Sequence, residues 1–350
     1  MIYVKQGTYD EIVRLGSSKT YVMIVGDGMN KTIITGSLNV VDGSTTFNSA
    51  TLGGLAAVGE GFILQDICIQ NTAGPEKHQA VALRVGADMS AINRSKIVVY
   101  QNTLYPHSLR QFYRDSIISG TVDFIFGNAV VVLQNCVLEA RLPMRGQKNM
   151  VTAQGRTDPN QITSTSVHAA LPGGAERRPD PGKGDGFPWK EYSRTVFLQS
   201  YLDDHIAPRG CHEWDGSFAL DTLFYGEYNN AGPGAGTAEN WTGYHVITDA
   251  EVAVAFMGYH GVSRHVQRRT MVQPTAGGSP SGSVWGSATV QEPGAYPEVQ
   301  LKKVSNYRAT LLENYTAGTT PLEVLTLHRY DAARNWTSDE KRPLRPHLWG

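Results

Sequence analysis

The chain has 350 residues, of which 41% are hydrophobic and 18% are charged, and its formal net charge is -1. This composition is typical of a globular protein with a sizeable buried core. The near-neutral charge argues against nucleic acid as a partner, and no apolar run of about eighteen residues predicts a membrane span. The 37 glycines favour an all-β fold with many tight turns.

Three cysteines, Cys68, Cys136 and Cys211, are spread along the chain. They form no CxxC pair, so the sequence does not predict a structural zinc site. An odd number of cysteines fits neither a complete disulfide framework nor a redox motif. We therefore expect no metal site.

The chain begins with MIYVK, which lacks the apolar segment of a signal peptide. These residues have the pattern of a β-strand that is already under way. We therefore expect that an upstream part of the domain is missing.

Residues 21–228 consist of short β-branched and aromatic runs separated by Gly, Asn, Asp or Ser. Several runs share a pattern in which apolar positions are followed by Gln or Arg, a small polar residue and further apolar positions; they cover residues 62–69, 98–104, 112–117, 131–138, 196–202 and 223–228. Asp115 and Asn135 are twenty residues apart, which is about one coil of a solenoid. The repetition predicts a β-solenoid, in which each coil buries its apolar face against its neighbours. A β-sandwich, which also has many short strands, is the alternative.

Two segments depart from this pattern. Residues 163–186 include AERRPDPGKGD, which is rich in turn-forming residues and has little to bury, so this segment is interpreted as an insertion or a replacement. The stretch from 274 to 297 is rich in Pro, Gly, Ser and Thr, which is typical of a linker. The predicted organisation is one solenoid domain over residues 1–272 and a separate extension over residues 273–350.

Searches for the motifs of common enzyme classes leave the function open. The sequence contains no GxSxG nucleophile elbow and no nucleotide-binding glycine motif. His212 and Glu213 are not followed by a second histidine at the spacing of zinc proteases. Asp204 and His205 are adjacent, but such pairs are common in loops and only weakly indicate a catalytic triad.

The solenoid period brings a set of polar residues into register. Gln79 and Gln101 are 22 residues apart, and Asn102 and Asp123 are 21 apart. Residues one coil apart stack with backbones about 4.8 Å apart, so these four are predicted to share one face of neighbouring coils. A carboxylate beside amides suits nucleophilic attack on a carbonyl, with the amide N–H groups stabilising the oxyanion. The alternative is a ladder of side chains that hydrogen-bond between coils for stability alone.

Several longer motifs are more specific than these spacings. They include NTAGPEKHQAVALRV (71–85), GTVDFIFG (120–127), QGRTDPN (154–160), PWKEYSR (188–194) and EWDG (213–216). Together they resemble the plant pectin methylesterases over about residues 2–262, and GTVDFIFG is the most specific of them. The resemblance implies a right-handed parallel β-helix whose first coil is missing from this sequence.

The resemblance also implies roles for the residues whose motifs match. Asp123 would be the nucleophile that attacks the methyl-ester carbonyl of a galacturonate unit, and Gln101 and Gln79 would stabilise the oxyanion. Trp189 and Trp214 would line the sugar-binding cleft, because aromatic faces pack on the apolar faces of pyranose rings. No metal or organic cofactor is implied.

Two positions depart from the family pattern. Asn102 stands in QNTLY where the family has an aspartate that acts as general acid and then base, and an amide cannot carry that proton. Phe187 stands in GFPW where the family has an arginine that holds the nucleophile's carboxylate. Ser95 and Ser116 stand where many members have cysteines. We therefore expect impaired activity.

The sequence thus predicts a pectinesterase that hydrolyses methyl esters of homogalacturonan. The resemblance implies methyl-esterified pectin as the substrate, a proteinaceous pectinesterase inhibitor as a partner, secretion to the plant cell wall, and a monomer. A non-catalytic pectin-binding β-helix and a degraded gene product are the alternatives. A calcium-dependent pectate lyase would need an acidic calcium cluster, and none is visible in the sequence around Asp123.

Overall fold

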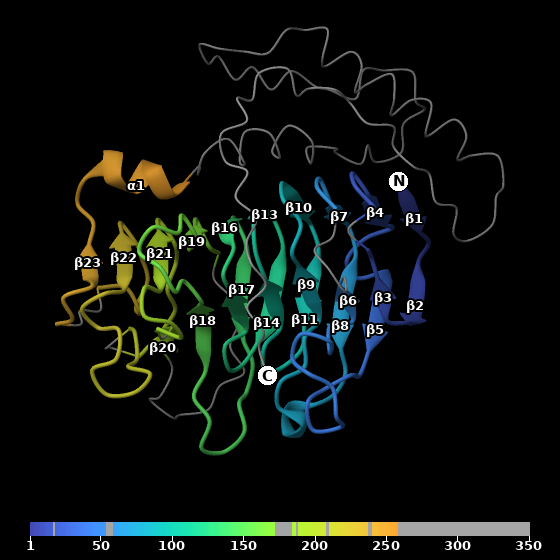
Figure 1. Cartoon of the computed structure of the whole chain (residues 1–350), viewed down its shortest axis with the longest axis horizontal. Coiled ribbons are helices and arrows are strands. Elements are labelled where there is room, and N and C mark those ends of the chain that lie inside the picture. Colours follow the sequence, from blue (N-terminus) through green and yellow to red (C-terminus); the bar gives the residue numbers. More distant parts are fainter. Residues whose placement is uncertain are drawn as a thin grey trace, which may run out of the picture.

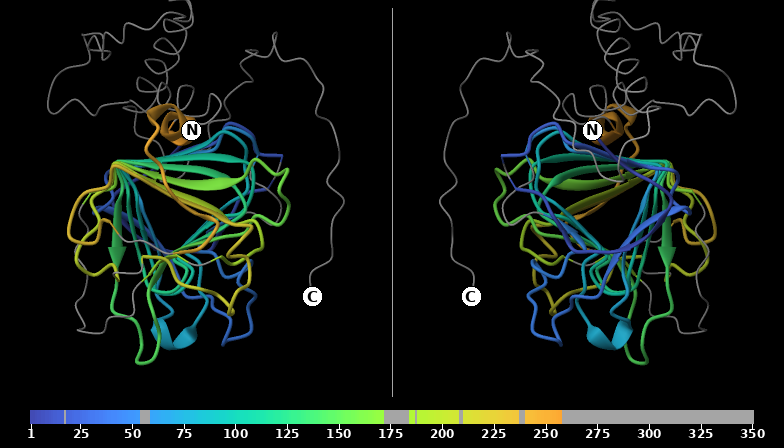
Figure 2. Two further views of the ribbon diagram at one scale, coloured as in Figure 1. Left: turned by 90° about the vertical axis from the view of Figure 1, so that its left-hand side faces the viewer. Right: turned by 90° about the vertical axis from the view of Figure 1, so that its right-hand side faces the viewer.

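The computed structural model describes residues 1–257 except 17, 54–58, 172–183, 187, 208, 209 and 237–239. In this part of the chain the regular structure is almost entirely β, in three parallel sheets (Figure 1). The chain visits the three sheets in turn, and the end-on views show them as the walls of a triangular prism (Figure 2). The fold is the parallel β-helix that the repeats predicted, and the β-sandwich alternative is wrong.

Each sheet takes strands from successive coils, and every strand pair is parallel. Sheet A consists of β1 (Ile2–Val4), β4 (Met23–Gly26), β7 (Ile63–Gln65), β10 (Ser90–Asn93), β13 (Arg110–Arg114), β16 (Val130–Gln134), β19 (Ser164–His168), β21 (Arg194–Leu198), β22 (Phe224–Tyr228) and β23 (Tyr244–Val246). Sheet B consists of β2 (Gly7–Asp10), β5 (Thr32–Gly36), β8 (Cys68–Asn71), β11 (Lys96–Val98), β14 (Ile117–Gly120) and β17 (Val137–Ala140). Sheet C consists of β3 (Val13–Arg14), β6 (Leu52–Gly53), β9 (Leu83–Val85), β12 (Leu104–Pro106), β15 (Ile125–Gly127), β18 (Met150–Gln154) and β20 (Gly184–Gly186).

Apolar side chains form a continuous core along the axis of the β-helix. The register of sheet A stacks Leu64, Ile92, Tyr113, Leu133, Val167 and Phe197 on successive coils. Sheet B contributes Ile34, Ile69, Ile97 and Ile118, and sheet C contributes Leu52, Leu83, Leu104 and Ile125. All of these side chains belong to one buried cluster. Each coil buries its apolar positions against the coils on either side, which is why the same pattern recurs along the sequence.

The corner between sheets A and B is built in the same way on seven coils. One residue with a positive φ directly follows each strand of sheet A from β7 to β22; these residues are Asp66, Arg94, Asp115, Asn135, Ala169, Gln199 and Asn229. In six of them the backbone N–H donates to a carbonyl of the next coil. Asp and Asn adopt this left-handed conformation at lower cost than other L-residues. Most of the repeated runs in the sequence mark this corner, whereas residues 98–104 lie at the corner between sheets B and C.

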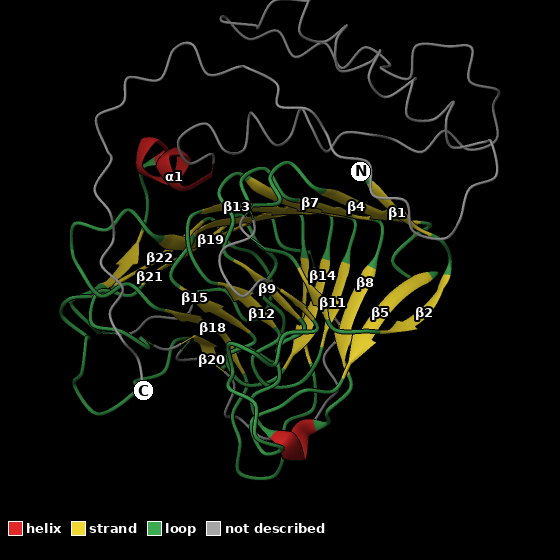
Figure 3. Cartoon of the chain, turned by 45° about the vertical axis from the view of Figure 1, so that its right-hand side comes forward, coloured by secondary structure: helices red, strands yellow, loops and turns green. Residues whose placement is uncertain are grey.

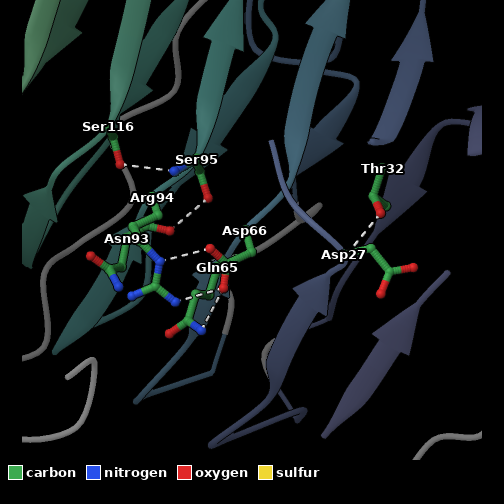
Figure 4. Close-up of polar contacts among 8 residues, drawn as sticks. All are labelled: Asp27, Thr32, Gln65, Asp66, Asn93, Arg94, Ser95 and Ser116. Carbon is green, nitrogen blue, oxygen red and sulfur yellow. Dashed lines mark hydrogen bonds and ion pairs between the residues drawn. The ribbon is translucent and has the colours of Figure 1, made fainter. Parts of the chain in front are cut away.

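Side chains at this corner also bond from coil to coil (Figure 4). Arg94 forms a bidentate ion pair with Asp66, with Nε to Oδ1 at 2.7 Å and Nη2 to Oδ2 at 2.6 Å. The N–H of Ser95 donates to Oγ of Ser116 at 3.1 Å. Ser95 and Ser116, the two serines singled out in the sequence, therefore link neighbouring coils by a hydrogen bond.

In the described part of the chain, a short 3₁₀ helix and one α-helix accompany the sheets (Figure 3). The 3₁₀ helix η1 (Pro75–Lys77) lies between β8 and β9, and α1 (Ala250–Met257) follows β23 and packs Ala253 against Val196 and Leu198 of sheet A. Neither of these helices could cross a membrane, nor could any other helix in the described ranges. The cysteines at 68, 136 and 211 are all buried.

Candidate active site

The polar residues predicted to stack lie at one end of the strands of sheet C. The register of β12 with β15 places Asn102 opposite Asp123. Gln79 pairs with Gln101 through an isolated parallel bridge. The four residues therefore form two adjacent stacked pairs on three successive coils, at the spacings of 22 and 21 residues seen in the sequence. Asn102 is buried and the other three are half-buried, so none of them lies on a fully exposed face.

Two glycines fix the loop that carries Asp123. A Cβ atom at Gly120 would clash with Phe124, and a Cβ atom at Gly127 would clash with the carbonyl oxygen of Pro106 on the preceding coil. Gly127 also has a φ of 142°, in the region that favours glycine. The first and last positions of GTVDFIFG therefore need glycine for steric reasons, and together they hold the Asp123 loop against its neighbour.

The carboxyl group of Asp123 is largely withdrawn from water. Its Oδ1 is fully enclosed and has no hydrogen-bond partner among the described residues. This burial raises the pKa of Asp123 to about 7, because a charged carboxylate loses its hydration there. A carboxyl group that titrates near neutral pH at a cleft is a typical feature of a catalytic site.

The side-chain amide of Asn102 hydrogen-bonds to the main chain of the neighbouring coil. Its Nδ2 donates to the main-chain carbonyl of Asp123 at 3.4 Å. Like Asp123, it has a positive φ, 66° against 49°, so the two loops have the same shape on neighbouring coils. Oε1 of the adjacent Gln101 is enclosed and has no hydrogen-bond partner in the described part of the chain. The site thus contains polar atoms that the described protein groups leave unsatisfied.

A row of aromatic rings lies on the outer face of sheet C. Tyr105 and Phe126 are stacked with their centroids 4.2 Å apart and their planes 24° apart. The ring of Trp189 meets Phe126 edge-on, with the centroids 6.3 Å apart. The side chains point outward because their neighbours Leu104 and Ile125 point into the core. Sequence reasoning missed Tyr105 and Phe126, although their 21-residue separation repeats the coil period.

The strand next to Trp189 is shaped to receive its ring. A Cβ atom at Gly155 would lie 2.9 Å from the indole, so only glycine leaves room for it. Arg156 is buried and donates from Nη1 to the carbonyl of Tyr192 at 3.2 Å, and its own N–H donates to Oε1 of Gln154 at 2.9 Å. The QGR motif therefore has a structural role, which is to fasten the segment that carries Trp189 to β18.

Trp214 lies in a second part of the site, a groove of about 370 Å³. Its side chain is 48% exposed and lines this groove together with Lys148, His212 and Glu213. Val122, which directly precedes Asp123, also lines the groove. Phe187, the other residue singled out in the sequence, lies outside the described residues.

One group of side chains in the described ranges is close enough together to ligate a metal ion. It consists of Asp203, Asp204 and His205, three consecutive residues in the connection between β21 and β22. Exposed acidic groups of this kind are common without an ion. None of the three is among the residues that the register places beside Asp123.

The fold and these side chains define a class of protein. It is a parallel β-helix in which sheet C and the loops before its strands carry a carboxyl group, amides and a row of aromatic rings. Comparison with known proteins identifies the family within that class. The family model "Pectinesterase" matches residues 1–264. The chain belongs to the pectinesterase family, as the motifs of its sequence predicted.

Individual relatives are similar over the same part of the chain. The chain is 64% identical over 262 residues to Pectinesterase 1 of Solanum lycopersicum, covering 73% of this chain and 47% of that protein. It is 62% identical over 262 residues to a Pectinesterase/pectinesterase inhibitor of Ficus pumila var. awkeotsang, covering 73% and 48%. The solved pectin methylesterase from carrot is 55% identical, with a TM-score of 0.70, covering 73% of this chain and 81% of that chain. The chain thus spans about half the length of these two curated relatives.

Proposed function

We propose that the chain hydrolyses methyl esters of homogalacturonan, releases methanol and leaves free carboxylates, with Asp123 as the nucleophile. The observation that carries the proposal is the carboxyl group of Asp123, which is enclosed, titrates near pH 7 and is stacked beside the amide-bearing residues of two preceding coils. The names of the relatives, pectinesterase and pectin methylesterase, support this choice of reaction.

In the first step the carboxylate of Asp123 attacks the carbonyl carbon of the ester. The carbonyl π electrons move to oxygen, and the N–H groups of Gln101 and Gln79 stabilise the oxyanion. When the tetrahedral species collapses, the bond to the methoxy oxygen breaks and that oxygen takes a proton to leave as methanol. Asp123 is then joined to the galacturonate acyl group as a mixed anhydride.

In the second step water attacks the galacturonate carbonyl of the anhydride and loses a proton. The bond to Asp123 breaks, which frees the galacturonate carboxylate and regenerates the nucleophile. Both steps need a group that carries a proton, and the amide of Asn102 cannot do so. In this chain the proton must be exchanged with water, and the loss of positioned acid–base catalysis costs roughly 10²–10⁴-fold in rate.

The aromatic residues supply the contacts to sugar rings. Tyr105 and Trp189 are half-buried and pack against the buried ring of Phe126, and the exposed Trp214 lines the groove. Pyranose rings have apolar faces that pack on such surfaces. The polymer therefore lies across successive coils, along the axis of the β-helix.

The test is methanol release from methyl-esterified pectin by the chain and by Asp123→Asn, each checked for folding. We expect slow turnover by the parent chain and none by the variant. Equal rates would rule out Asp123 as the nucleophile. A chain that fails to unfold cooperatively would instead support a degraded gene product.

A non-catalytic pectin-binding β-helix is the second candidate, and the amide at position 102 favours it, because the site then retains the aromatic surface without a proton carrier. Pectin binding by the parent chain, weakened in Trp189→Ala, together with no detectable methanol release, would establish this alternative.

The remaining parts of the proposal concern location and partners. A chain that acts on pectin would be secreted to the plant cell wall, where this polymer is found. The Ficus relative combines the names pectinesterase and pectinesterase inhibitor, so we include a proteinaceous inhibitor as a partner. We expect a monomer, which light scattering of the purified chain would test.

A further inference from the structure

Asparagines in the pattern N-x-S/T are acceptors for N-linked oligosaccharides in proteins that pass through the secretory pathway. The sequence contains five of them, at Asn30, Asn93, Asn240, Asn314 and Asn335. The last two lie outside the described residues, and Asn240 directly follows residues 237–239, which lie outside them as well. Asn30 and Asn93 can be compared in structural detail, because both lie at the corner between sheets A and B.

Asn30 is exposed on a coil where this corner is longer than on the coils that follow. Five residues, 27–31, separate β4 from β5, whereas two residues separate β10 from β11. The N–H groups of Lys31 and Thr32 both donate to the carbonyl of Gly28, at 2.9 and 3.0 Å, which closes a turn that contains Asn30. The side chain of Asn30 makes no hydrogen bond within the described part of the chain, so its amide is available for modification.

Asn93 has the opposite surroundings. It ends β10 and is only 3% exposed. Its main-chain carbonyl accepts from the N–H of Asp66 at 3.2 Å and from Oγ of Ser95 at 3.0 Å. The next residue, Arg94, is held by its ion pair with Asp66 (Figure 4). An oligosaccharide on the amide of Asn93 would have to displace these neighbours, so the folded chain has no room for one.

The hydroxyl group of the first pattern is buried although its asparagine is exposed. Thr32 begins β5 and has none of its surface exposed. Its Oγ1 accepts from the N–H of Asp27 at 2.9 Å (Figure 4) and lies 3.3 Å from the carbonyl oxygens of Val4 and Lys5. Transfer of an oligosaccharide needs access to this hydroxyl as well as to the amide. Any transfer to Asn30 must therefore take place before β5 pairs with β2.

We propose that Asn30 carries an N-linked oligosaccharide, attached before β5 pairs with β2, and that Asn93 carries none in the folded chain. Nδ2 of Asn30 forms a bond to C1 of the first N-acetylglucosamine of a lipid-pyrophosphate oligosaccharide. The bond from C1 to the pyrophosphate oxygen breaks, the lipid pyrophosphate leaves as an anion, and a base of the transferase takes the amide proton. The inference rests on the secretion that the proposed function implies. Asp123 lies at a different corner, between β14 and β15, so the oligosaccharide leaves the site open.

The test is mass-spectrometric peptide mapping of the full chain, directed to the secretory pathway of plant cells by an added signal peptide. We expect the peptide with Asn30 to carry an oligosaccharide in most molecules, and the peptide with Asn93 to carry none in the folded fraction. Asn30→Gln should lose one oligosaccharide. Asn160→Gln, at an exposed asparagine outside the pattern, is the matched control and should lose none. An unmodified Asn30 or a modified Asn93 in the folded, secreted chain overturns the inference, and the parent alone gives this answer even if a variant fails to fold.

A second measurement tests the order of events. The chain is refolded after bacterial expression and is then incubated with the transferase and its lipid-linked donor. It should stay unmodified at Asn30, because the hydroxyl of Thr32 is buried in the folded chain. The same chain, denatured before incubation, should be modified. Equal modification of the folded and denatured chains would overturn attachment before folding.

The oligosaccharide is measured independently of methanol release, which separates this inference from the proposed reaction. A modified Asn30 in a chain that releases no methanol supports the inference and counts against the reaction. Methanol release by a secreted chain with an unmodified Asn30 overturns the inference and leaves the reaction standing. Where both hold, the rates of the parent and of Asn30→Gln should agree within about twofold, as for a surface substitution away from the site.

Discussion

The side-chain amide of Asn102 donates to the main-chain carbonyl of Asp123, and the carboxyl group of Asp123 keeps one enclosed oxygen without a partner in the described part of the chain. The two residues lie opposite each other on adjacent coils, yet the amide of Asn102 bonds to the main chain of Asp123 and not to its carboxyl group. This relationship separates two properties of the site, its architecture and its ability to move a proton. Each can be tested by a different substitution.

Asn102→Asp should raise the rate of methanol release by about 10²-fold or more, because it supplies the group that protonates methanol and later activates water. Phe187→Arg alone should do little, since a better-held nucleophile still lacks an acid. The double variant should exceed the sum of the single gains, because both changes act on one carboxylate. The measurement is methanol release by the parent, the two single variants and the double variant, each shown to be folded. A parent as fast as the double variant would mean that another group transfers the proton.

The stability of the chain should fall as pH rises from about 4 towards neutrality. The pKa of Asp123 is raised to about 7 in the folded chain, whereas an unfolded aspartate titrates near 4, so the folded state holds a proton that the unfolded state has lost. The contribution is fully present below about pH 4 and is lost as pH rises through about 7, with a slope of at most about 1.4 kcal/mol per pH unit. Urea unfolding at several pH values would measure it.

Asp123→Asn is the control for this pH dependence. The variant should lack that part of the slope between about pH 4 and pH 7, and an unchanged slope would contradict the prediction. Methanol release should show the opposite trend and increase towards pH 7, because only the ionised carboxylate is a nucleophile.

Gly155→Ala should displace the ring of Trp189 and weaken pectin binding several-fold. The added Cβ would lie 2.9 Å from the indole, so the ring must move, and overpacking of this kind costs roughly 1–3 kcal/mol of stability. Gly16→Ala, at a position with no atom within 4 Å of the added Cβ, is the matched control. Binding to immobilised pectin and thermal unfolding would be measured for both. If Gly155→Ala binds as well as the control, Trp189 does not contact the polymer.

Ala169→Asn should stabilise the fold by about 0.5–1 kcal/mol. Ala169 has a φ of 50° at a corner where neighbouring coils carry Asn or Gln, and a left-handed alanine is strained by about 1–2 kcal/mol. Asparagine adopts this conformation more readily. Ala170→Asn, one position later, should destabilise because that side chain is buried. Denaturant unfolding of the two variants should give shifts of opposite sign, and shifts of the same sign would exclude backbone strain as the cause.

Most of the fold could be predicted from the sequence repeat, because the length of one coil determines which residues stack on adjacent coils. The spacing of Asn102 and Asp123 is therefore sufficient by itself to predict that they lie opposite each other on adjacent coils. The aromatic row was less visible: Tyr105 and Phe126 repeat with the same period, but aromatic residues in a β-rich sequence are expected as strand formers in any case.

Other parts of the site have no periodic signal. Lys148 and His212 come from irregular connections on different coils, and their 64-residue separation spans coils of unequal length, so it gives no register. The steric need for glycine at position 155 depends on the path of the segment that carries Trp189, which only the folded chain defines. The sequence therefore predicted the residues on the strands of the site much better than those on its loops.

The left-handed corner between sheets A and B has a consequence for how this scaffold can change. On the four coils from β7 to β17 only two residues separate a strand of sheet A from the following strand of sheet B. Because the first of these residues donates its N–H to the next coil, one inserted residue would shift two coils at once. The corner between sheets B and C accepts connections as different as the four residues between β14 and β15 and the nine between β17 and β18, and the corner between sheets C and A has two residues between β15 and β16 but nine between β18 and β19. On these four coils, insertions and deletions, and with them new ligand preferences, are therefore expected at the other two edges of the prism; the corner between sheets A and B is longer only elsewhere, as in the five residues between β4 and β5.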